Sequence, residues 1–169
     1  MTVVSDAVIR PARTSDVKII RELVDMYAPD RRLLSKATVT LYEDVPEFLI
    51  VEHDGVAIAC GAVHVMWEDL AEVRTVAVAP EFRGKGVGSF LLTSLMDRAR
   101  DLGVKRVFCL TFETEFFTSH GFVEIEGTPV DHVVFEQLLQ SYDEGVAEFL
   151  DLERVKPNTL GNIRMLRIL

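Results

Sequence analysis

The residues most suited to chemistry lie near the middle of the chain, where an apolar stretch ends in a glycine-rich turn. The turn is Arg83-Gly84-Lys85-Gly86-Val87-Gly88, and a long amphipathic helix is predicted directly after it. Glycines at alternate positions let successive backbone N–H groups point into one concave site, which also faces the positive end of the helix dipole. This arrangement is typical of a site for a phosphate or pyrophosphate group.

Three phosphate-binding motifs compete for this turn. The P-loop requires GxxxxGK[ST], and Gly84-Lys85-Gly86 has neither that spacing nor the hydroxyl residue. The dinucleotide fingerprint requires GxGxxG in an N-terminal βαβ unit, whereas these glycines follow GxGxG spacing. The third motif, RxxGxG, fits as Arg83-x-x-Gly86-x-Gly88. The alternative without a ligand is a glycine-rich loop that serves only tight packing.

The elements that position this turn are predicted from apolar periodicity and turn residues. Continuous β-rich runs predict strands over residues 8–13, 48–52, 56–66, 71–79, 104–111, 122–125 and 165–169. Helical spacing predicts helices over residues 17–27, 31–45, from the glycine turn to 102, 115–120 and 131–142. Asp54-Gly55 predicts a hairpin turn, and Gly103 is expected at the C′ position of the long helix. Residues 143–162 give no clear pattern.

Two charged residues interrupt the predicted strand before the turn. Strict alternation places Glu72, Arg74, Val76 and Val78 on one face, unless a bulge intervenes. A cation in an apolar strand requires a partner when it is desolvated, and that partner is either a ligand or a neighbouring carboxylate.

The order of elements predicts a mixed α/β sheet covered by helices. At 169 residues, without repeats or linkers, the chain is expected to form one domain over residues 1–169. The net charge of −9 argues against a nucleic-acid partner, although a local basic cluster can still hold a small anion. No apolar run is of membrane-spanning length and no signal peptide is recognised, so we expect a cytoplasmic protein with no membrane partner.

The two cysteines, Cys60 and Cys109, lie inside apolar runs and are expected to be reduced core residues. They have no histidine partner at ligand spacing, so no zinc site and no other metal is expected.

In its order of motifs the sequence resembles the GNAT N-acetyltransferase superfamily. RxxGxG follows the strand segment Val76-Ala77-Val78, and a helix ending in Gly121-Phe122 comes downstream. The resemblance implies one GNAT-type domain, whose mixed, largely antiparallel sheet contains a splayed strand pair and is flanked by helices. It implies acetyl-CoA as co-substrate, with its pyrophosphate on the turn. The implied cofactor-binding residues are Val76, Ala77, Val78, Arg83, Gly84, Lys85, Gly86, Val87, Gly88, Thr111 and Phe117.

Residues 58–63, 72–78 and 106–111 look like the acetyltransferase domain of N-acetylglutamate synthases, in the short, stand-alone actinobacterial form. This resemblance implies transfer of acetyl to the α-amino group of glutamate or glutamine, the first step of arginine biosynthesis. It implies a cofactor-binding core over about residues 71–126, an acceptor-side region over about residues 127–169 and self-association into a homodimer.

For catalysis, the family implies direct attack of a neutral amine on the thioester through a tetrahedral intermediate. A backbone N–H near Val76 or Ala77 would polarise the carbonyl, and Glu72 would act as general base. The alternative for Glu72 is a solvent-facing strand end or a partner of Arg74. Glu113 is the reserve base. Phe117 stands where many GNAT enzymes have a tyrosine that protonates the leaving thiolate.

An amino-acid acceptor needs basic partners for its carboxylates, preferably arginine in bidentate geometry. The residues we assign to the acceptor side are Lys36, Arg74, Glu113, Lys156 and Arg164. Arg74 has a structural alternative, a salt bridge with Glu72 or Glu113, and Lys36 has a solvated helical face. Two further functions stay open: a GNAT enzyme for another small amine or a protein N-terminus, and a non-catalytic acetyl-CoA sensor, which Phe117 would fit.

Overall fold

A seven-stranded sheet forms the centre of the molecule, in the order β1-β2-β3-β4-β5-β7-β6. The computed structural model describes residues 3–27, 37–150 and 162–169. All neighbouring strands pair antiparallel except β4 and β5, which are parallel. The mixed, largely antiparallel sheet predicted from the sequence is therefore confirmed. The strands are β1 (Ala7–Pro11), β2 (Phe48–His53), β3 (Val56–Trp67), β4 (Leu70–Val78), β5 (Arg106–Thr111), β6 (Val123–Glu124) and β7 (Ile163–Ile168).

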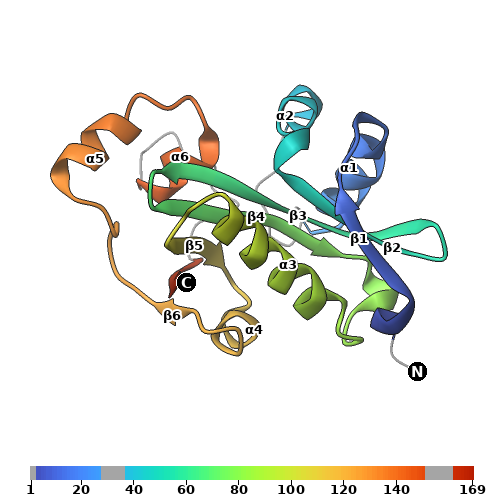
Figure 1. The fold of residues 1–169 in the computed structure, drawn as a ribbon. Helices are drawn as coiled ribbons and strands as arrows, with labels where there is room; N and C mark the ends of the chain where they lie inside the picture. The colour runs from blue at the N-terminus through green and yellow to red at the C-terminus, as the bar shows by residue number, and fades with distance from the viewer. Residues whose placement is uncertain (1–2, 28–36, 151–161) are drawn as a thin grey trace.

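Helices cover both faces of this sheet (Figure 1). Helices α1 (Val17–Asp25) and α2 (Thr38–Glu43) bury one apolar cluster against it, and α3 (Val87–Asp101) and α4 (Thr114–Thr118) bury another on the opposite face. Towards the C-terminal end of the chain, α5 (His132–Leu138) and α6 (Glu144–Phe149) contribute to a third cluster around Phe108. Short 3-10 helices lie at Val3–Asp6 (η1), Thr14–Asp16 (η2), Val45–Glu47 (η3) and Pro80–Phe82 (η4).

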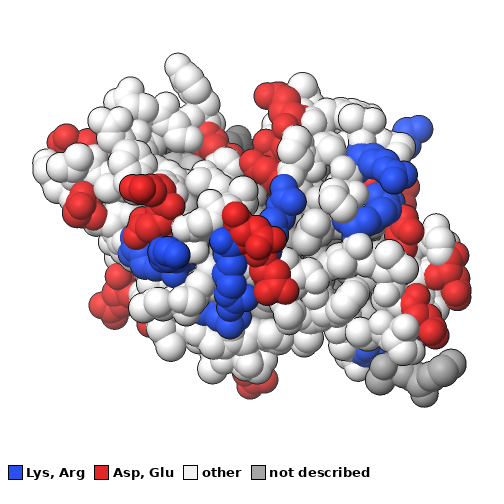
Figure 2. All heavy atoms as spheres, viewed as in Figure 1, with Lys and Arg blue, Asp and Glu red and all other residues white. Residues whose placement is uncertain are grey.

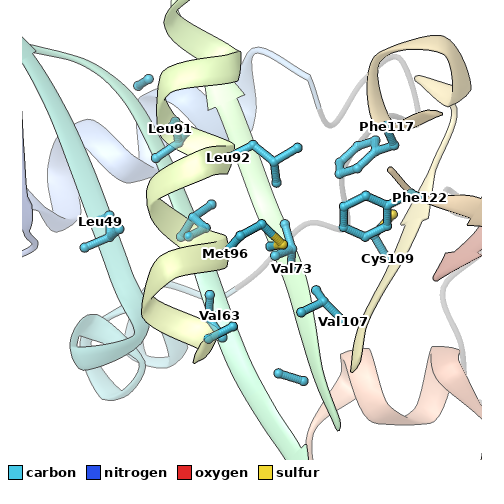
Figure 3. Close-up of a cluster of buried hydrophobic side chains, with 14 of the residues drawn as sticks. Leu49, Val63, Val73, Leu91, Leu92, Met96, Val107, Cys109, Phe117 and Phe122 are labelled. Atoms are coloured by element: carbon cyan, nitrogen blue, oxygen red, sulfur yellow. The ribbon is translucent and has the colours of Figure 1, made fainter. Parts of the chain in front are cut away.

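Helix α3 forms where the apolar spacing predicts it and packs directly on β3 and β4. Leu91, Leu92 and Met96 point from the helix towards side chains of the sheet (Figure 3). The helix ends in a Schellman motif, since Gly103 has φ 92° and the N–H groups of Gly103 and Val104 donate to the carbonyls of Arg100 and Ala99. The predicted C′ position of Gly103 is confirmed.

The hairpin predicted at Asp54-Gly55 is also confirmed. Both residues have positive φ, 52° and 75°, and they join β2 to β3. Positive φ at both central residues is the geometry of a type I′ turn, whose twist matches that of the flanking strands.

A β-bulge interrupts β4, which is the exception to strict alternation that the sequence left open. Cys60 pairs with Ala77 and Ala62 pairs with Arg74, so Thr75 and Val76 together oppose Gly61. Thr75 has φ 60°, a left-handed conformation that is rare for a β-branched residue. Val76 therefore packs on the α3 side, in the same cluster as Val73. The charged pair at 72 and 74 does not share that face, because the alternation shifts at the bulge.

The bulge adjoins the place where β4 and β5 separate. These strands pair only over residues 70–72 and 106–108, although β4 continues to Val78 and β5 to Thr111. The splayed strand pair implied by the family resemblance is confirmed, and the space between the strands adjoins the glycine turn.

Two predicted elements need correction. The helix expected over residues 131–142 ends at Leu138, and the segment without a clear pattern contains α6. The first part of the helix predicted over residues 31–45 lies outside the described residues, of which α2 begins at Thr38. Cys60 and Cys109 are buried and form no disulfide, as expected. Across the described ranges, no helix is long and apolar enough to cross a membrane.

Candidate active site

A cavity of about 340 Å³ fills the space between the diverging strands β4 and β5. The bulge and the strand that follows it form one wall, the carboxyl end of β5 and helix α4 form the other, and the glycine turn closes one end. Its lining residues include Tyr27, Arg74, Thr75, Val76, Val78, Arg83, Gly84, Gly86, Gly88, Ser89, Cys109, Thr111, Glu113, Phe116 and Phe117.

The glycine turn has the backbone geometry of an anion site. Gly84 and Gly86 have positive φ, 72° and 83°, and Gly86 is the N-cap of α3. The first N–H groups of a helix have no partner inside the helix, and the helix dipole adds positive potential at the same point. Because this turn and the cavity meet, the residues fit an elongated ligand with a phosphate group at the turn and an uncharged arm between the strands.

The predicted cofactor residues fall into two groups. Eight of them line the cavity: Val76, Val78, Arg83, Gly84, Gly86, Gly88, Thr111 and Phe117. The other three do not. Ala77 faces the α1 side of the sheet, Val87 at the start of α3 is buried in the core, and the Lys85 ammonium lies 5.6 Å from the centre of the Phe82 ring.

Aromatic side chains that the sequence analysis missed complete the cavity. The Tyr27 hydroxyl donates a hydrogen bond to the Val78 carbonyl, and the Arg83 guanidinium lies 5.7 Å from the centre of the Tyr27 ring. Tyr27 is the last residue of the helix predicted over residues 17–27, and no sequence pattern there indicates a ligand-binding role. Phe116 contacts the other side, where a Cβ added to Gly88 would lie 3.4 Å from its ring.

The charged pair on β4 is deeply buried on the face opposite α3. Glu72 is 5% exposed and Arg74 is 7% exposed. The Arg74 guanidinium donates to Glu72 Oε2 at 3.2 Å, and its two terminal nitrogens donate to both oxygens of Asp143 at 2.9 and 2.8 Å. Of the two carboxylates suggested as structural partners of Arg74, Glu72 forms the ion pair. Asp143 was missed because it lies in the segment without a sequence pattern.

A histidine on β3 connects this cluster to the 3-10 helix η3. Nδ1 of His64 lies 2.9 Å from Glu47 Oε2, and its Nε2 lies 3.9 Å from Asp143 Oδ2. Burial opposes the charge on Asp143, but the hydrogen bonds and charge of Arg74 outweigh burial and hold the pKa of Asp143 well below its usual range. Burial likewise opposes the charge on Arg74, while Glu72 and Asp143 raise the pKa of Arg74 above its usual value.

The remaining acceptor-side candidates lie apart. Arg164 donates to the carbonyls of Gly127 and of Glu148 and Phe149, so it binds the last turn of α6. Glu113 lines the cavity, 4.0 Å from Arg83. Lys36 and Lys156 lie outside the described residues. Within the described part of the chain, no group of three or more histidine, cysteine or acidic side chains is arranged to hold a metal ion.

Comparison with known proteins identifies the family. Residues 18–127 match the acetyltransferase (GNAT) family. The chain belongs to this family. It is 58% identical over 165 residues to an amino-acid acetyltransferase of Mycobacterium tuberculosis, a match that covers 96% of this chain and 94% of that protein.

Solved structures of GNAT proteins agree with this assignment. A crystal structure of a Mycobacterium tuberculosis protein in complex with CoA and NLQ has a TM-score of 0.92 at 58% identity, covering 96% of this chain and 99% of that one. N-acetylglutamate synthase from Neisseria gonorrhoeae, complexed with coenzyme A and N-acetyl-glutamate, has a TM-score of 0.77 at 25% identity. The match covers 96% of this chain but only 35% of that longer protein.

The surface charge is mixed. On the face drawn in Figure 2, basic side chains form small groups that alternate with acidic ones. A protein that binds a nucleic-acid backbone needs a broad basic face, and this view shows none among the described residues.

Proposed function

We propose that this GNAT protein is an acetyl-CoA-dependent amino-acid N-acetyltransferase whose acceptor is the α-amino group of glutamate or glutamine. The observation that carries the proposal is the continuity of one cavity. It joins an anion-binding glycine turn to the bulge on β4 and to Arg74, which contacts the buried carboxylate of Glu72. One site then holds the cofactor's phosphates, the point of transfer and a charged group suited to an amino acid.

For the cofactor, acetyl-CoA would supply an acetyl group activated as a thioester. The amides of residues 83–88 would hold its diphosphate, with Arg83 adding charge, and Val76 and Val78 would form the wall beside the pantetheine arm. The bulge interrupts the ladder between β3 and β4. The backbone N–H of Val76 or Ala77 is therefore the proposed donor to the thioester carbonyl, and donors fixed in this way are a large source of catalysis.

For the proton, Glu72 is the proposed general base. The adjacent guanidinium of Arg74 favours the ionised form that a base needs, because a nearby positive charge stabilises a carboxylate's charge. Glu72 is not among the residues that line the cavity, so the acceptor amine must reach it from beside Arg74.

For the acceptor, Arg74 is the proposed carboxylate partner, but its two terminal nitrogens already bind Asp143. Its Nε is buried and has no hydrogen-bond partner among the described residues. This N–H is the donor that we assign to an oxygen of the acceptor, which replaces the bidentate contact expected from the sequence. Lys36, Lys156, Glu113 and Arg164 keep their proposed acceptor-side roles, with Arg164 acting from β7, where it contacts the C-terminal end of α6.

The similarity to the Neisseria N-acetylglutamate synthase supports a place in arginine biosynthesis, at its first step in the cytoplasm. Expression of the chain in bacteria that lack their own amino-acid acetyltransferase should restore growth without arginine, and an Arg83→Ala variant should not.

A homodimer is also proposed, by analogy with the family. Sedimentation equilibrium should give twice the mass of the 19.0 kDa chain.

The direct test of the proposed function is release of CoA from acetyl-CoA in the presence of each of the common amino acids. We expect turnover with glutamate or glutamine and much slower turnover with the other amino acids. Turnover only with a different amine or a peptide amino terminus would replace the acceptor assignment. Binding of acetyl-CoA without CoA release would instead indicate the non-catalytic sensor that Phe117 suggested.

A further inference from the structure

We propose that Asp143 is a positioning residue for acetyl transfer, which acts through Arg74 on the charge state of Glu72. The inference deepens the proposed function and rests on it, because it assigns Glu72 the task of taking the acceptor's proton. Neither the sequence pattern nor the family resemblance points to Asp143, which is 69 residues away from Arg74 in the chain.

Arg74 is shared unequally between two carboxylates. Asp143 receives two hydrogen bonds from Arg74, at 2.8 and 2.9 Å, whereas Glu72 receives one at 3.2 Å. A bidentate, charge-assisted pair is both shorter and more strongly directional than a single bond. Asp143 therefore fixes the plane of the guanidinium, and Glu72 contacts only the edge that remains.

Asp143 itself is held in place by helix α6. It is the N-cap of α6, and one of its carboxylate oxygens accepts from the Val146 N–H at 2.9 Å. Its own N–H donates to the Ser141 hydroxyl at 3.1 Å. Because these bonds fix the Asp143 carboxylate, the carboxylate determines the orientation of the Arg74 guanidinium.

The first turn of α6 is shaped for this contact. A Cβ added to Gly145 would lie 2.5 Å from one terminal nitrogen of Arg74 and 2.6 Å from its central carbon. Only a residue without a side chain lets the helix approach the guanidinium so closely. The other end of α6 is held by Arg164, which donates to the Phe149 carbonyl at 2.8 Å.

The charges around Glu72 determine the direction of the effect. Among the described residues, Arg74 lies on the same strand as Glu72, and His64 on β3 lies directly opposite Glu72 in the register. His64 in turn contacts Glu47 of η3 and lies 3.9 Å from Asp143, the N-cap of α6, and the Cys109 thiol comes from β5. Arg74 is thus the positive charge nearest to Glu72 among these groups, and Asp143 offsets part of it. If Asp143 is neutralised, the full charge of Arg74 acts on Glu72, and the pKa of Glu72 falls.

The test is Asp143→Asn, which removes the charge but keeps a good helix N-cap. The matched control is Asp131→Asn. Asp131 is the exposed N-cap of α5, accepts from the Val134 N–H at the same 2.9 Å and is not part of the proposed site. Two quantities are measured: the titration of the Glu72 carboxyl by carbon-13 NMR in the ligand-free protein, and the pH profile of kcat/KM with the acceptor.

In Asp143→Asn we expect the Glu72 titration and the acidic limb of the kcat/KM profile to move together to lower pH by about one unit. A weaker base should also lower kcat on the plateau by about three- to tenfold. Asp131→Asn should move neither quantity, and Asp143→Glu, which restores a carboxylate, should recover most of the wild-type profile.

An unmoved Glu72 titration in Asp143→Asn overturns the inference. So does a loss of activity that is equal at every pH and accompanied only by a lower melting temperature. If the asparagine variant does not fold, Asp143→Ser keeps the N-cap and takes its place. Should the wild-type protein turn over no amino acid, the proposed function fails, while the NMR titration still decides whether Asp143 controls Glu72.

Discussion

At the scale of single residues, Glu72 combines deep burial with a charged partner. Its carboxylate is 5% exposed, and the Arg74 guanidinium, 3.2 Å away, favours the ionised form. Glu113, the reserve base, is in a different environment, since about half of its side chain is exposed and it lies beside Arg83 near the glycine turn. The two carboxylates can therefore be separated experimentally.

Replacing Glu72 with glutamine should lower kcat by about a hundredfold or more, because a positioned general base contributes on the order of 10²- to 10⁴-fold. The KM for acetyl-CoA should stay close to that of the wild type, because Glu72 does not line the cofactor cavity. Glu113→Gln should show the reverse pattern, with kcat retained and the KM for acetyl-CoA altered. A large loss of kcat in Glu113→Gln, with an active Glu72→Gln, would transfer the base role to Glu113.

At the scale of elements, helix α6 depends on one position that has room for a hydrogen only. Gly145→Ala should destabilise the protein and lower kcat, because the added methyl group overlaps the Arg74 guanidinium. Helix propensity alone predicts the opposite sign, a gain of about 1 kcal/mol for alanine over glycine. Urea denaturation measures the free energy of unfolding, and a more stable, fully active variant would show that α6 does not pack as described.

The attachment of α6 should also depend on pH. Asp143 has a lowered pKa in the folded protein, so its stabilising contribution is complete above the unfolded value of about 4. This contribution is lost as the pH falls below about 4 and through the pKa of Asp143 in the folded protein. The difference in unfolding free energy between the wild type and Asp143→Asn should thus be largest near neutrality and shrink below about pH 4. A difference that is constant over this range would contradict the assignment.

Local signals explain which elements could be predicted. The turn at Asp54-Gly55 and the end of α3 at Gly103 are set by backbone conformations that few residues adopt, so the residue type reveals the structure. The anion site follows from the same logic at Gly84 and Gly86.

The features that the sequence left open or missed depend on contacts distant in sequence. A bulge in β4 was allowed for, but it places Thr75 at φ 60°, against the preference of threonine, and only the register with β3 locates it. Helix α6 has six residues, and the contacts that hold it come from Arg74 and Arg164 on separate strands. The sequence therefore predicts that the buried Arg74 needs a partner, but it does not predict that Arg74 binds both Glu72 and Asp143.

At the scale of the whole molecule, we predict that the chain unfolds as one domain. The three apolar clusters share one continuous sheet, so loss of one exposes the next. Fluorescence of Trp67, the one tryptophan of the chain, reports on the end of β3, while far-ultraviolet circular dichroism reports on all helices and strands. The two urea transitions should coincide. Two separate transitions would show that the C-terminal region folds independently of the cofactor-binding core.

The central claim is that the glycine turn and the splayed strands form one cofactor site, and a crystal structure with CoA bound tests it most directly. We expect the diphosphate on the amides of residues 83–88, with the pantetheine arm in the cavity between β4 and β5 and its sulfur near the bulge at Val76. CoA bound elsewhere, with the turn and the cavity filled by the chain's own side chains, would contradict it.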